Sequence, residues 1–159
     1  MDSMTLKNII CLSLILGVVL GIIACIPYIG VIGLISLFLL SAPLVTIYLI
    51  MDSKLELTTI KDSIINGALI GFVTSLSFSA IYAIITVSID KIFHYTNNLI
   101  LTTMIENSSI FLFIVAIFFM GIVYATTNAF SGFMTYYTIN FIRDLYEKKQ
   151  QNEEQNDRI

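Results

Sequence analysis

Residues 66–83 read NGALIGFVTSLSFSAIYA and carry a small side chain at every fourth position from residue 67 onward. Side chains four residues apart lie on one face of an α-helix. In lipid, hydrophobicity gives little force between helices, and a face of small residues lets two helices approach closely. The stretch therefore predicts a membrane-spanning helix with a close-packing face, or alternatively a face that lines a narrow path for a small solute or ion. The small residues are Gly67, Gly71, Ser75, Ser79 and Ala83.

Two other apolar stretches carry small residues at the same spacing. Gly17 and Gly21 form a short face near the N-terminus, and Gly121, Ala125 and Ala129 form one in the last apolar stretch. We therefore expect a compact bundle, or an oligomer, that is held together by these helix-packing faces.

The whole chain has the composition of a membrane protein. Of its 159 residues, 57% are apolar and 12% are charged, whereas about a quarter of a soluble domain is charged. Each of the four apolar stretches, at about 9–26, 29–51, 62–89 and 109–133, is long enough to cross a hydrocarbon core of about 30 Å. The sequence predicts an all-α, polytopic transmembrane four-helix bundle that forms a single domain over residues 1–145.

Lysine and arginine residues give the expected orientation. With four spans, the N-terminus, the 52–61 loop and the C-terminus lie on one side of the membrane, and only Lys91 lies on the other. Positively charged segments stay in the cytoplasm, so both termini are expected there. The last helix should extend to about residue 145, and residues 146–159 should form a cytoplasmic polar tail that is largely disordered. The seven basic residues on the cytoplasmic side are Lys7, Lys54, Lys61, Arg143, Lys148, Lys149 and Arg158.

Polar residues inside the third and fourth stretches form a candidate site. An unpaired amide in hydrocarbon costs several kcal/mol, so Asn128 should have a hydrogen-bond partner. Serines of the third stretch are the expected partners. The cluster is either a polar contact between helices or a binding site for a solute, and it comprises Ser75, Ser79, Thr127, Asn128 and Ser131.

Pro43 lies within the second stretch. Proline has no backbone N–H and therefore leaves the carbonyl of Leu39 without its usual partner. We expect a kink at Pro43, which serves either packing or a hinge motion.

Several classes of function are disfavoured. No Asp, Glu, Lys or Arg lies in the middle of any span, whereas proton-coupled transporters and voltage sensors use such groups. His94 is the only histidine, so the sequence predicts no metal site and no catalytic triad. It also contains no nucleotide-binding motif and no basic patch for nucleic acid. We expect no catalytic residue, metal or cofactor.

The segment Ile22–Cys25 leaves one alternative open for the first span, because lipidation of Cys25 would remove that span.

The chain resembles small four-span bacterial membrane proteins of unknown function. The resemblance lies in a tight first hairpin at Ile26-Pro27-Tyr28, a short charged loop, and a third span that opens as Ile64-Ile65-Asn66-Gly67-Ala68. It implies a place in the bacterial inner (plasma) membrane and no activity. Because the spans carry small-residue faces and no intramembrane charge, the expected function is a structural or partner subunit that lies in the lipid bilayer. It is expected to assemble through those faces as a homo-oligomer or with another membrane protein. The alternative is a small transporter or channel subunit for a neutral solute or ion.

Overall fold

A computed structural model describes residues 3–26, 29–55, 59–93 and 110–156 of the chain. The predicted turn at Pro27 and Tyr28 and the end of the predicted tail lie outside these described residues. The described elements are α1 (Ser3–Ala24), α2 (Gly30–Ile35), a π-helical turn η1 (Ser36–Leu40), α3 (Ser41–Met51), α4 (Ile60–Phe93) and α6 (Ile110–Asn156).

The described residues form four candidate membrane spans, as the sequence predicts. They are α1, the continuous run of α2, η1 and α3, then α4, and finally α6, and each is long and apolar enough to cross a bilayer. The described residues contain no β-strand. The predicted all-α fold with four spans is therefore confirmed, and the chain belongs to the class of integral membrane proteins.

Helix α4 begins at a capping threonine. The hydroxyl of Thr59 accepts a hydrogen bond from the backbone N–H of Asp62 at 3.1 Å and donates one to the Asp62 carboxylate at 2.7 Å. This side-chain bond satisfies one of the free N–H groups of the first turn, which fixes the start of the helix.

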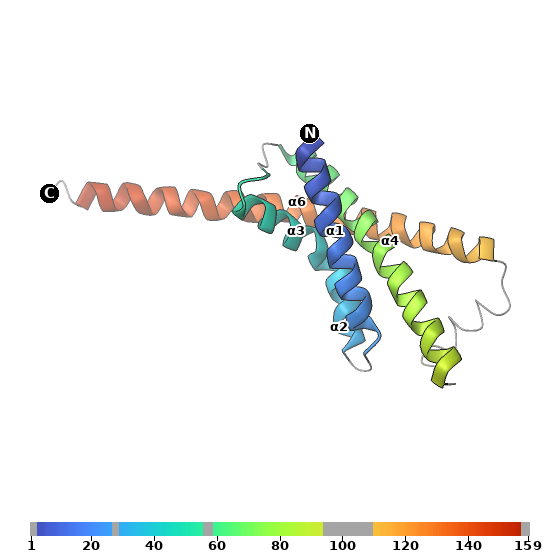
Figure 1. The fold of residues 1–159 in the computed structure, drawn as a ribbon. Helices are drawn as coiled ribbons and strands as arrows, with labels where there is room; N and C mark the ends of the chain where they lie inside the picture. The colour runs from blue at the N-terminus through green and yellow to red at the C-terminus, as the bar shows by residue number, and fades with distance from the viewer. Residues whose placement is uncertain (1–2, 27–28, 56–58, 94–109, 157–159) are drawn as a thin grey trace.

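Helix α6 is longer than the sequence analysis expects. It has 47 residues and continues to Asn156, whereas the expected helix ends near residue 145. Residues 141–150 are all exposed, and Figure 1 shows this part of α6 extending away from the other helices. The segment is rich in Glu, Lys and Gln, which favour helix, and it contains neither glycine nor proline. Local propensity therefore explains why the helix continues without tertiary contacts.

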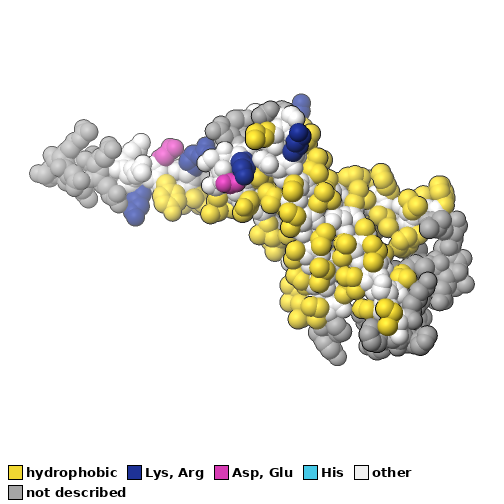
Figure 2. All heavy atoms as spheres, viewed as in Figure 1, with side chains coloured by type: hydrophobic (Ala, Val, Ile, Leu, Met, Phe, Trp, Pro, Cys, Tyr) yellow, Lys and Arg dark blue, Asp and Glu magenta, His cyan; other side chains and the backbone are white. Residues whose placement is uncertain are grey.

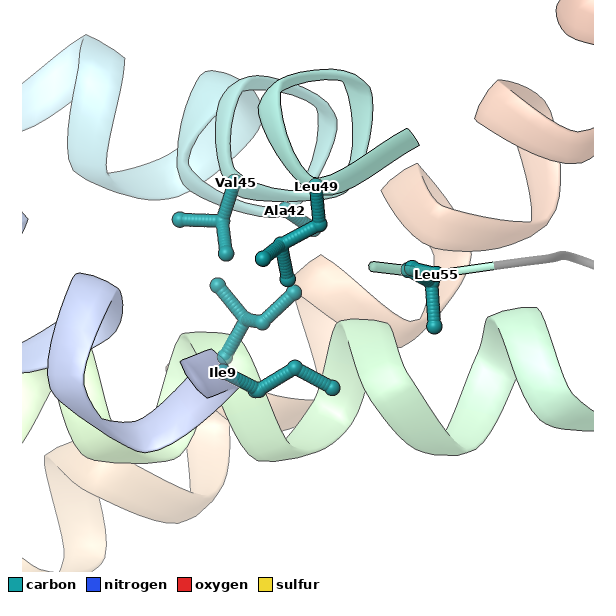
Figure 3. Packing of buried hydrophobic residues seen from close by; sticks show 6 residues of the cluster. Ile9, Ala42, Val45, Leu49 and Leu55 are labelled. Carbon is teal, nitrogen blue, oxygen red and sulfur yellow. The ribbon is translucent and has the colours of Figure 1, made fainter. Parts of the chain in front are cut away.

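The helices pack around α4. In Figure 1, α1 and the second span lie side by side, α4 lies next to α1, and α6 runs across them. Figure 3 shows side chains from α1 and α3 converging on one cluster near the N-terminal end of the bundle. Ile9 and Leu49 are fully buried in it, and Ile70 of α4 completes it. This cluster closes one end of the bundle.

Charged side chains occupy the same end as the N-terminus. Figure 2 shows Lys, Arg, Asp and Glu there and along the extended part of α6, whereas the rest of that face is apolar. Lys54 forms an ion pair with Asp52 in the short segment after α3, and this carboxylate raises the pKa of the lysine.

Candidate functional site

The second span is interrupted at η1, near the middle of its length. In a regular α-helix the N–H groups of residues 42 and 43 would bond to the carbonyls of Phe38 and Leu39. Here the N–H of Ala42 donates to the side chain of Asn128 instead, and Pro43 has no N–H to donate. The interruption therefore exposes backbone carbonyls inside the membrane, where each one needs another partner.

Asn128 of α6 supplies most of the missing partners. Its Oδ1 accepts hydrogen bonds from the N–H of Ala42 at 3.0 Å and the hydroxyl of Ser41 at 2.8 Å. Its Nδ2 lies 3.1 Å from the carbonyl oxygen of Leu37, 3.3 Å from that of Phe38, and 3.1 Å from that of Tyr124 in its own helix. The side chain is fully buried. Asn128 thus joins the fourth span to the interrupted second span.

Two serines complete the same site. The hydroxyl of Ser131 donates to the carbonyl oxygen of Leu39 at 2.6 Å, which is the carbonyl that Pro43 leaves without a donor. The hydroxyl of Ser41 lies 2.8 Å from the carbonyl oxygen of Leu37 as well as from Asn128. Every carbonyl from Leu37 to Leu39 therefore has a side-chain donor.

Close contact between α4 and α6 brings Asn128 to this position. A Cβ atom added at Gly71 would lie 2.5 Å from the Cβ of Asn128 and 2.6 Å from the carbonyl oxygen of Tyr124. A Cβ added at Gly132 would lie 2.5 Å from the carbonyl oxygen of Ser63, and the Ser63 hydroxyl donates to the Gly132 carbonyl at 2.7 Å. At Gly67 the added atom would collide with the backbone of residue 128. The two helices therefore touch through their backbones, which only small residues permit.

The glycines of α1 contact the other side of α4. A Cβ added at Gly17 would lie 2.7 Å from the Cβ of Ser77, and one added at Gly21 would lie 3.2 Å from the side chain of Ile81. The hydroxyl of Ser77 also donates to the carbonyl oxygen of Leu14 at 2.9 Å. The small-residue positions of α1 and α4 thus pack helices of the same chain against each other.

The other predicted residues have different surroundings. The hydroxyl of Thr127 bonds to the carbonyl of Val123 in its own helix. Ser75 is fully buried, but its hydroxyl has no hydrogen-bond partner. Ser79 and Ala83 do not reach the Asn128 site and instead line a cavity between α4 and α6. Gly121 packs beside the ring of Phe72, whereas Ala125 and Ala129 are half-buried on α6.

Sequence reasoning anticipates a partner for Asn128 but not which helix provides it. The expected partners are serines of the third span, whereas the observed ones are Ser41 and the backbone of the second span. Ser41 precedes Pro43 by two residues, and this pairing of a hydroxyl with a proline was the available signal. Ser63 was also missed, although it lies one turn before Gly67 on the same helix face.

The site binds helices together and has no group suited to acid–base chemistry. It consists of the Asn128 amide, the hydroxyls of Ser41 and Ser131, and backbone groups of the second span. These groups form hydrogen bonds with one another. Across residues 3–26, 29–55, 59–93 and 110–156, no three His, Cys, Asp or Glu side chains lie close enough together to hold a metal ion.

Comparison with protein families, with characterised proteins and with solved structures finds no match to this chain.

Proposed function

We propose that the protein is a non-catalytic membrane subunit that assembles, through α6, with a second copy or with another membrane protein. The exposure of α6 carries this proposal. Only 17% of the most apolar part of α6 is buried within the chain, compared with 28% for α1 and α4 and 33% for the second span. Phe130 and Phe141 are both 63% exposed. Aromatic side chains such as these are enriched in protein–protein interfaces.

The use of the small-residue faces and of the polar cluster supports a structural role. Gly17, Gly21, Gly67 and Gly71 all contact helices of the same chain, so assembly through these residues is disfavoured. Asn128 bonds to the second span with both ends of its amide, which leaves it little capacity for a solute. These contacts build a stable bundle whose remaining surface is available to a partner.

The proposed orientation places both termini in the cytoplasm of a bacterial inner membrane. Charged side chains gather at the end of the bundle that holds the N-terminus (Figure 2), in agreement with a cytoplasmic position for that end. The proposed location in the bacterial inner membrane is based only on the resemblance in layout to small four-span bacterial membrane proteins.

Native mass spectrometry after gentle extraction from the membrane tests the assembly. We expect a defined oligomer or a co-purifying membrane protein. The paired change Phe130→Ala and Met134→Ala on α6 should abolish it, because both side chains are at least half exposed there. The matched change Val31→Ala and Ile32→Ala on α2, at 62% and 63% exposure, should leave it intact. A monomer at every protein concentration, with no co-purifying chain, would refute the proposal.

A second candidate, a subunit that binds a small neutral solute or ion, is favoured by one observation. Four buried polar atoms on α1 and α4 lack hydrogen-bond partners, and they are Ser13 Oγ, Asn66 Oδ1, Thr74 Oγ1 and Ser75 Oγ. Such atoms need a partner such as water or a small polar molecule. Uptake by proteoliposomes that is lost in Thr74→Val, while the protein still folds, would favour this function over assembly.

A further inference from the structure

The face of small residues on α4 has two parts with different neighbours. Its first part, at Gly67 and Gly71, is in backbone contact with α6. Its second part, at Ser79 and Ala83, faces a cavity of about 400 Å³, because α4 and α6 diverge beyond their crossing (Figure 1). We call this space the lateral cavity. The same helix face therefore seats a helix at one end and leaves room for another molecule at the other.

The lateral cavity has an almost wholly apolar lining. Helix α4 contributes Phe78, Ser79 and Ala83, and α6 contributes Phe113, Ala116 and Met120. The rings of Phe78 and Tyr82 stack at 5.7 Å with an interplanar angle of 9° and give the cavity a flat wall. None of the described residues that line it carries a charged side chain.

The position and size of the lateral cavity decide what occupies it. It is half open, and its neighbours Ile84 and Phe119 are 63% and 64% exposed, so it opens into the hydrocarbon of the bilayer. A flexible hydrocarbon chain suits both the volume and the lining, because ligand pockets of about 300–1,000 Å³ are mostly apolar.

We propose that the lateral cavity binds the acyl chain of a membrane lipid. Ala83 and Ala116 determine its volume, because they are the smallest side chains on its two walls. The bound chain replaces the packing that α4 and α6 lose where they diverge. The proposal is independent of the assembly through the Phe130 face of α6.

The test uses the full chain in nanodiscs with a phospholipid that carries a photoactivatable diazirine in its acyl chain. We expect labelling of the peptides around Ala83 and Ala116 that saturates at one lipid per chain. Ala83→Leu should lower this labelling at least tenfold, because its larger side chain fills the cavity. The control is Ala80→Leu, on the same helix at an exposed position, and it should label as the wild type does.

Thermal unfolding of each variant checks that the fold is retained, and Ala116→Leu replaces Ala83→Leu if the latter does not fold. Equal labelling of Ala83→Leu and Ala80→Leu would overturn the proposal, because it would show only the general lipid shell. Labelling that never saturates would overturn it as well. Cross-links from the cavity walls to a second copy or to another segment of this chain would assign the cavity to a protein occupant and would also overturn it.

Discussion

Asn128 stabilises the bundle through bonds that no other single side chain on α6 supplies. Replacing it with leucine would leave the N–H of Ala42 and the carbonyl of Phe38 without a side-chain partner inside the bundle, whereas the Leu37 carbonyl would keep the hydroxyl of Ser41. We expect Asn128→Leu to lower the free energy of unfolding by about 2–6 kcal/mol, because two groups lose their partner and each costs roughly 1–3 kcal/mol. Unfolding by denaturant in mixed micelles measures this change.

The control for Asn128→Leu is Thr126→Val, two residues away on the same helix. Thr126 is exposed and bonds only to the carbonyl of Ile122 in its own helix, so its loss should cost no more than about 0.5 kcal/mol. Equal stability of the two variants would contradict the assigned role of Asn128. A stable Asn128→Leu protein that had lost transport would instead support a solute site.

Gly71 controls how closely α4 and α6 approach. We expect Gly71→Ala to destabilise the protein by about 1–3 kcal/mol, because the new methyl group would force two backbones apart in a packed interface. Gly33→Ala is the matched control, since its Cβ would meet Ile23 at an ordinary 3.4 Å. That variant should be neutral or more stable by roughly 0.5–1 kcal/mol, because alanine is the better helix former. Thermal midpoints in one detergent compare the two, and a reversed order would refute the close contact.

The second span, with its π-helical turn, depends on α6 for its hydrogen bonds. Ser131 bonds to the Leu39 carbonyl because Pro43 cannot. Ser131→Ala should cost about 1 kcal/mol in the natural protein. It should cost clearly less when residue 43 is alanine, because the restored N–H can serve the same carbonyl. A double-mutant cycle measures the difference, which we expect to be about 0.5–1 kcal/mol. Additive effects would show that the two residues do not share this carbonyl.

The sequence predicts the elements that depend on local chemistry. Four spans follow from apolar length, because the bilayer fixes how many helical residues are needed to cross it. The start of α4 follows from the capping hydroxyl of Thr59. The sequence does not predict the π-helical turn at Ser36–Leu40. The residues SLFLL are an ordinary apolar stretch, and their partner Asn128 lies about 90 residues away. Pro43 marks the neighbourhood of the break but not the residues that stabilise it.

The sequence predicts which residue of the candidate site needs hydrogen-bond partners, but it does not predict which helix supplies them. A lone asparagine in hydrocarbon must find partners, which singles out Asn128. Which helix supplies them depends on the crossing of α4 and α6, which glycines at 67, 71 and 132 permit together. The sequence does not single out Gly132, because the small-residue spacing in that stretch begins at Gly121 and continues through Ala125 and Ala129.

At the scale of the whole molecule, the positions of the basic residues predict the orientation in the membrane. Lys7, Lys54 and Lys61 lie at the end of the bundle that holds the N-terminus, and Ile92 lies at the opposite end of α4. Basic segments resist translocation, so the Lys54 end should face the cytoplasm. The two ends can be distinguished by a reagent that cannot cross the membrane.

The test introduces one cysteine at a time into a chain whose Cys11 and Cys25 are replaced by serine. Ile92 is 69% exposed, and we expect Ile92→Cys to react with an impermeant maleimide on intact cells. Asp52→Cys, in the segment after α3, should react only after the cells are lysed, because that segment is cytoplasmic. The reverse pattern would invert the orientation. If both cysteines reacted on intact cells, residues 52 and 92 would lie on the same side of the membrane, and α4 would not span it.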